Sequence, residues 1–185
     1  MRKLLLAAIA GLFVGLVGCS DEGAEPTPEP KAKTNMELIT EGSWRVEDGT
    51  ISPSIDIDIQ GNTITVNNYW DLLAIQGGGQ VMDCDKDNIM ILKSDSSVVL
   101  DEGPTKCDAN DPQTQDGGKW HFMDNETKLK FSSFPFDPEG NPQVLDVDSL
   151  TSEVLHIRMI YQFVNPLDPT DISDHEIKLD YRNTN

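Results

Sequence analysis

Residues 55–66, IDIDIQGNTITV, carry an apolar side chain at every second position on each side of a glycine. A period of two is typical of a β-strand with one buried and one exposed face. Gly61-Asn62 is a dipeptide that favours a two-residue hairpin turn. A turn at these two residues would pair Ile59 with Ile64 and place both on one face. The stretch therefore predicts two antiparallel strands that share a buried face.

The same alternation returns along the rest of the chain. The longest run is Ser152–Val164, whose odd-numbered residues form a continuous apolar face, and the turn residues 165–169 end it. In the last predicted strand, Ile177, Leu179 and Tyr181 would face inward between charged residues. Further short strands, separated by polar turns, are predicted at 88–93, 98–100, 119–123, 129–131 and 143–147.

These strands follow one another in sequence order, so the pattern predicts an all-β fold of about eight or nine strands. Consecutive antiparallel strands form a meander, and closing the meander removes its exposed edges. We therefore expect an up-and-down antiparallel meander barrel. A β-sandwich of two sheets is the alternative.

One short helix is predicted ahead of the first strand. Thr34 and Glu37 have the spacing of a capping box, and residues 36–39 supply an apolar side. Gly42-Ser43-Trp44 follows the predicted helix directly.

The N-terminal residues predict a secretory signal peptide. Arg2 and Lys3 precede an uncharged apolar run, residues 4–17, which is shorter than the roughly 20 residues of a transmembrane helix. The run ends in Leu16-Val17-Gly18-Cys19, which resembles the lipobox of bacterial lipoproteins. The resemblance implies cleavage after residue 18, a diacylglycerol thioether on Cys19 and acylation of the new N-terminus. An ordinary signal peptide with an incidental cysteine is the alternative.

A tether is predicted behind Cys19. Residues 20–33 contain three prolines and no large apolar side chain, so they cannot bury enough surface to offset their ordering entropy. Ser20-Asp21-Glu22 resembles the surface-export signal of Bacteroidetes lipoproteins, which implies a cell-surface position on the outer membrane; a periplasm-facing lipoprotein is the alternative. We therefore expect a signal peptide (1–18), a lipid-anchored flexible tether (19–34) and one β-domain (35–185).

Charge restricts the class of partner. The chain has 14 Lys and Arg against 32 Asp and Glu, a net charge of −18. Removal of residues 1–18 would take away two basic residues and no acidic one, which leaves a net charge of −20. A chain this acidic repels phosphate backbones, so nucleic acid is excluded as an expected partner.

The cysteines fit an exported protein. With Cys19 assigned to lipid, Cys84 and Cys107 remain, and two cysteines in an oxidising compartment most simply pair with each other. A metal site is the alternative, although neither cysteine belongs to a CxxC motif and His121, His156 and His175 show no ligand spacing to them. We expect the disulfide.

An ordered series of motifs in the middle of the chain resembles the lipocalin-like domains of Bacteroidetes lipoproteins. The series comprises Asp71-Leu72-Leu73-Ala74, Asp83–Asn88, Lys93-Ser94-Asp95, Asp101–Asp108 with its Glu-Gly-x-x-Lys-Cys segment, and Gly118-Lys119-Trp120. The resemblance spans residues 38–181 and implies a small meander barrel, a Cys84–Cys107 link and an unassigned ligand. Separately, the short predicted helix followed by Gly42-Ser43-Trp44 resembles the lipocalins, in which such a helix closes one barrel end and the tryptophan packs over it. The turn after Lys93 departs from the family because it lacks a glycine. The family supplies no binding or catalytic residues to carry over, so the ligand-binding residues stay unassigned.

Residues 70–82, with three consecutive glycines, are expected to form a mobile loop at the barrel mouth. Residues 134–141 form a second loop, with an unusually apolar Phe134-Pro135-Phe136.

No motif in the sequence predicts catalysis. Asp83, Asp85 and Asp87 alternate as in a calcium loop, but an EF-hand needs glycine and glutamate where Asn88 and Ser94 stand. We find no nucleophile elbow and no phosphate-binding loop. We therefore expect a non-enzymatic protein without metal or cofactor. A small apolar ligand held in the barrel is the first expectation, and a surface module with a filled barrel that contacts proteins or glycans is the alternative.

Overall fold

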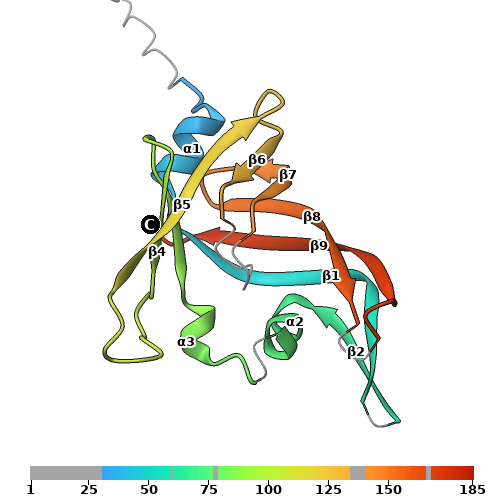
Figure 1. Cartoon of the computed structure of the whole chain (residues 1–185). Helices are drawn as coiled ribbons and strands as arrows, with labels where there is room; N and C mark the ends of the chain where they lie inside the picture. Colours follow the sequence, from blue (N-terminus) through green and yellow to red (C-terminus); the bar gives the residue numbers. More distant parts are fainter. Residues whose placement is uncertain (1–30, 60, 77–78, 134–140, 166–167) are drawn as a thin grey trace, which may run out of the picture. The chain divides into compact units, whose positions relative to one another are not determined.

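A computed structural model describes residues 31–59, 61–76, 79–133, 141–165 and 168–185 (Figure 1). Residues Lys33–Asn185 form a compact unit. Its helices are α1 (Asn35–Glu41), α2 (Tyr69–Gln76) and α3 (Asp83–Lys86). Its strands are β1 (Trp44–Ile59), β2 (Asn62–Asn68), β3 (Ile89–Leu92), β4 (Ser97–Asp101), β5 (Thr114–Met123), β6 (Lys128–Phe131), β7 (Gln143–Leu150), β8 (Val154–Val164) and β9 (Ile172–Asn183). None of the helices in this described part is long and apolar enough to cross a membrane.

The strands form a closed antiparallel barrel. Their order is β2-β1-β3-β4-β5-β6-β7-β8-β9, and a further pairing of β1 with β9 closes the ring. Eight strands make the barrel, and β2 is attached to β1 as an extra strand. The predicted meander barrel is therefore confirmed, and the sandwich alternative is not.

β1 takes part in three pairings because it is long. Trp44 and Arg45 pair with β3, Trp44–Ser52 pairs with β9, and Ile55–Ile59 pairs with β2. The register is irregular between Thr50 and Ile55, where Pro53 has no N–H to donate to a ladder. Beyond this bend, β1 and β2 form a hairpin that extends away from α1 (Figure 1).

The register of the β1–β2 hairpin differs from the prediction by two residues. Ile64 pairs with Ile57 rather than with Ile59, and Ile59 pairs with Asn62. Gly61 has a φ of +80° and is the second of the two turn positions, whereas the prediction placed it first. Because the shift is an even number of residues, the apolar side chains stay on one face. Ile55, Ile57 and Val66 are buried on that face, as predicted, whereas Ile64 is exposed.

Alternation along the strands builds the core. On β9 the side chains of Ile177, Leu179 and Tyr181 are each 1% exposed, as predicted, and their neighbours face solvent. On β8 Leu155 and Ile157 are buried opposite Tyr181 and Leu179. The odd-numbered faces of both strands therefore line the barrel interior.

α1 lies against β3 and β7 at one end of the barrel (Figure 1). The predicted capping box is present, since the Thr34 and Glu37 side chains each accept a bond from the backbone N–H of the other. Trp44 is fully buried, and its Nε1 donates to the carbonyl of Ile39 at 2.9 Å. A Cβ on Gly42 would lie 2.4 Å from the Trp44 ring, so only glycine fits beneath the indole.

The loop predicted for residues 70–82 is wrong over its first half, which is helix α2. Asn68 Oδ1 accepts from the N–H of Asp71 at 2.9 Å and satisfies an open donor at the helix start. Tyr69 and Leu72 are each 2% exposed, so the helix is held by burial in the core. Residues 77–78 lie outside the described residues, and so do residues 134–140 of the second predicted loop.

Candidate functional site

Partly buried apolar side chains lie on α2 and on the stretch of β8 to which a hydrogen bond from Gln76 to Tyr161 joins it. β8 contributes Met159 and Tyr161 from its inward face, and α2 contributes Trp70, Leu73 and Ile75. All five pack against the fully buried core and still reach solvent. This group, which we call the α2-end cluster, offers apolar and aromatic surface next to the barrel interior.

A hydrogen bond ties α2 to the barrel wall at this cluster. Gln76 Nε2, at the last residue of α2, donates to Tyr161 Oη on β8 at 2.6 Å. Gln76 is exposed and Tyr161 is half-buried, so the bond lies where the cluster meets solvent. The arrangement places a polar pair at the rim of an apolar surface, which is the usual composition of a small-molecule site.

A buried histidine lies next to Tyr161. His175 on β9 is 4% exposed and pairs across the strands with Tyr161. Its Nδ1 lies 2.7 Å from the Pro53 carbonyl, and its Nε2 lies 2.7 Å from Ser173 Oγ. A carbonyl oxygen only accepts, so Nδ1 must donate, and a neutral ring then accepts the Ser173 proton at Nε2. Both ring nitrogens are thus engaged, and the histidine joins the bend of β1 to β9.

Two tyrosines lie deep in the core. Tyr69 from α2 and Tyr181 from β9 are 2% and 1% exposed. Burial, and to a smaller extent the neighbouring Tyr69, raises the pKa of Tyr181 well above its ordinary value of 10.0. Tyr181 therefore stays protonated across the physiological range, and its hydroxyl, like that of Tyr69, is a polar atom in the largely apolar core.

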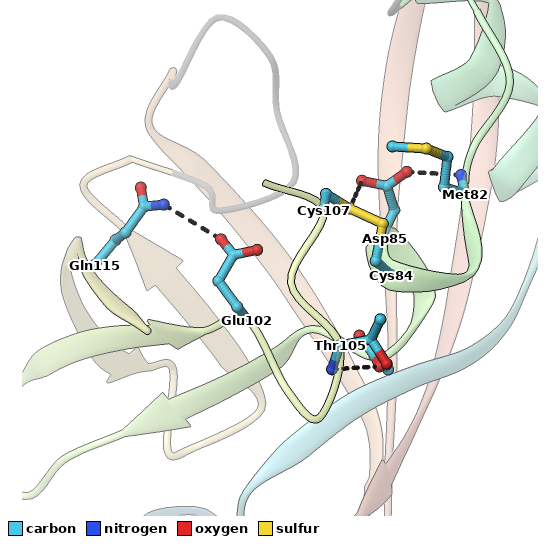
Figure 2. The surroundings of a disulfide bond; sticks show 8 residues. Met82, Cys84, Asp85, Glu102, Thr105, Cys107 and Gln115 are labelled. Atoms are coloured by element: carbon cyan, nitrogen blue, oxygen red, sulfur yellow. Dashed lines mark hydrogen bonds between the residues drawn. A yellow bond between two sulfur atoms is a disulfide. The ribbon is translucent and has the colours of Figure 1, made fainter. Parts of the chain in front are cut away.

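Cys84 and Cys107 form the expected disulfide (Figure 2). Cys84 is buried on α3, and the Cα atoms of the two cysteines are 5.3 Å apart. The Asp85 carboxylate lies beside the disulfide, with Oδ1 3.4 Å from Cys107 Sγ. Sulfurs bonded to each other are not thiolates, so the three residues do not form a metal site in this state. The disulfide instead fastens α3 to the loop after β4.

Two of the three aspartates compared with a calcium loop, Asp85 and Asp87, accept hydrogen bonds from backbone groups. Asp85 Oδ2 accepts from the N–H of Met82 at 2.7 Å, and Asp87 Oδ2 accepts from the N–H of Thr105 at 3.1 Å (Figure 2). These carboxylates cap the start of α3 and hold the 102–105 turn. They serve local structure on both sides of the disulfide.

The other histidines lie on the outer surface. His156 Nδ1 is 2.5 Å from Asp180 Oδ1 on the outward faces of β8 and β9, and His121 is exposed on β5. Neither is part of the α2-end cluster. Cys19 lies outside the described residues.

Sequence reasoning missed two parts of this site, and each had a signal. Asn68 followed by Asp71 at a capping spacing, ahead of an apolar run, could have indicated α2. His175 has the same parity as Ile177, Leu179 and Tyr181, so it belongs on the inward face of its strand.

Comparison with known proteins assigns no family. No protein-family model matches the chain, and no curated protein matches it at significance.

Proposed function

We propose that this chain is a cell-envelope lipoprotein whose barrel binds a small apolar ligand at the α2 end. The observation that carries the proposal is the α2-end cluster, five partly buried apolar residues with the Gln76–Tyr161 hydrogen bond at their rim. Eight strands make a barrel just wide enough for one small ligand or for its own side chains. Ile39 of α1 and Trp44 are fully buried. The end of the barrel beside α2 is therefore the expected entrance for a ligand.

A matched pair of tryptophan substitutions tests this site. Met159→Trp adds a large side chain inside the α2-end cluster, and Ile160→Trp adds the same side chain one residue away, at a position 65% exposed on the outer face. The probe is a fluorescent polyene fatty acid titrated into the mature protein. We expect saturable binding, weakened about tenfold or more by Met159→Trp, which corresponds to about 1.4 kcal/mol, and unchanged by Ile160→Trp.

Thermal unfolding of both variants controls for misfolding. Binding that is absent from the wild type, or that both substitutions weaken equally, would contradict a ligand site at the α2 end.

A second candidate function is a surface module that contacts a protein or glycan partner. It is favoured by exposed apolar side chains on the outer faces of β7, β8 and β9, namely Val144, Ile160, Val164 and Ile172, which are 44–65% exposed. Exposed apolar groups of this kind often mark interaction sites. A wild type that binds no apolar probe, but loses a partner on Ile160→Asp, would favour this candidate.

The membrane anchor is proposed from the lipobox and rests on sequence. Metabolic labelling with a radioactive fatty acid should label the wild type and leave Cys19→Ser unlabelled. Protease added to intact cells would separate the two orientations, because only a surface-exposed domain is then degraded.

A further inference from the structure

β2 is an edge strand without the usual protection. Within the described residues β2 pairs with β1 alone, and Asn62–Thr65 are exposed. Natural edge strands are commonly protected by lysine, proline or a bulge. The β2 sequence NTITVNN contains no charge and no proline, although a quarter of the chain is charged. An uncharged edge on a protein of net charge −18 is a surface to which another strand can add.

The hairpin geometry identifies the backbone groups that face outward. Ile59 and Asn62 close a two-residue turn, and such a closing pair exchanges both backbone hydrogen bonds. Because bonding alternates along an antiparallel ladder, Thr63, Thr65 and Asn67 direct their N–H and C=O groups away from β1. These groups are the ones that an added strand would meet.

The strand is also nearly self-complementary. The residues at equal distances on the two sides of Thr65 are of similar type. These pairs are Ile64 with Val66, Thr63 with Asn67, and Asn62 with Asn68. A two-fold axis at Thr65 would therefore set β-branched apolar residues opposite each other on one face. On the other face it would set small polar side chains opposite each other. Ile64, which is 43% exposed, would be covered by the second copy.

We propose that β2 is a dimerisation edge, on which the β2 strand of a second copy of this chain pairs antiparallel about an axis at Thr65. The backbone N–H and C=O of Thr65 point away from β1. Thr65 of one chain would therefore exchange backbone hydrogen bonds with Thr65 of the second chain, as an isologous interface requires. Asp56, which accepts from Thr65 Oγ1 at 2.7 Å, and Asp58, which pairs with Thr63, bring two negative charges per chain near the axis. Added salt should therefore strengthen the dimer.

Cysteine cross-linking of the full chain in the membrane tests the geometry. Paired Cα atoms at a hydrogen-bonded position are about 5.5 Å apart, within the range of a disulfide. Thr65→Cys should give a reducible homodimer on a non-reducing gel. Gln162→Cys, at an exposed strand position on β8, should stay monomeric. Equal cross-linking of the two variants, or capture of a foreign protein by Thr65→Cys, would overturn the proposal.

A charge exchange tests it without cross-linking. In detergent, the full-length Thr65→Lys and Thr65→Glu chains should each sediment as monomers, and their mixture should regain the dimer mass of the wild type. A monomeric wild type at high salt, or a mixture that stays monomeric, would overturn a two-fold axis at Thr65.

Discussion

Gln76 and Tyr161 are 85 residues apart in the chain, and a hydrogen bond of 2.6 Å from Gln76 Nε2 to Tyr161 Oη joins them. The bond links the last residue of α2 to the inward face of β8. It is the polar contact at the rim of the α2-end cluster, and it holds the last residue of α2 against β8.

Loss of this bond should loosen α2. Tyr161→Phe removes the acceptor oxygen and keeps the ring, so we expect faster amide hydrogen exchange over residues 69–76. An exposed hydrogen bond contributes about 1 kcal/mol or less to stability, so the barrel strands should exchange as in the wild type. Gln115→Ala, which removes a similar exposed amide bond to Glu102, should leave exchange in α2 unchanged. Unaltered exchange over 69–76 in Tyr161→Phe would show that burial of Tyr69 and Leu72 alone holds the helix.

The packing of Trp44 makes Gly42 sensitive to substitution. Gly42→Ala would place a methyl group 2.4 Å from the indole, and we expect a loss of about 1–3 kcal/mol in the free energy of unfolding. Gly79→Ala meets no atom within 4 Å and should change stability by less than about 0.5 kcal/mol. Urea unfolding followed by tryptophan fluorescence measures both. If the two variants have equal midpoints, the Gly42–Trp44 contact is not a tight one.

The disulfide should stabilise the folded state through its loop. It joins residues 23 apart, and in the chain-entropy model a loop of this length contributes about 3 kcal/mol. The double variant Cys84→Ser and Cys107→Ser should therefore unfold at a lower urea concentration than the oxidised wild type. Reduced wild type is the matched control and should unfold near the double variant. A double variant as stable as the oxidised protein would rule out this contribution.

The turn between β3 and β4 predicts one local pH effect. Hydrogen bonds from the Ser97 hydroxyl and then from its backbone N–H lower the pKa of Asp95 below its ordinary value of 3.8. A lowered folded-state pKa stabilises the fold above the unfolded-state pKa, and this stabilisation is lost as pH falls through the folded value. Ser97→Ala should raise the pKa of Asp95 toward 3.8, as measured by NMR titration of the side-chain carboxyl carbon. Thr170→Ala removes the equivalent bond at Asp168 and should leave the pKa of Asp95 unchanged.

The strands were predictable because a strand with one buried face has an apolar residue at every second position. Ile177, Leu179 and Tyr181 alternate with charged residues and are buried as that period requires. The capping box at Thr34 was predictable for a similar reason, since its contacts reach only three residues along the chain.

Other features were missed because the alternation of apolar residues does not decide them, or because they depend on distant contacts. The observed register of the β1–β2 hairpin differs from the predicted one by two residues. Gly61 can be the first or the second of the two turn residues, and both choices keep the apolar side chains on one face, so the alternation does not decide between them. Nearly every residue of α2 is apolar, so no amphipathic stripe marked this segment as a helix, and only its capping residues Asn68 and Asp71 carried a signal. His175 and Pro53 are 122 residues apart in the sequence, so no local sequence pattern could predict their contact.

Native mass spectrometry of the protein purified from its source cells tests most directly whether a ligand is bound at the α2 end of the barrel. We predict a discrete added mass that survives desalting and is absent from Met159→Trp but present in Ile160→Trp. A bare protein mass in the wild type, after exposure to a lipid and metabolite extract of the source cells, would contradict a ligand at this end.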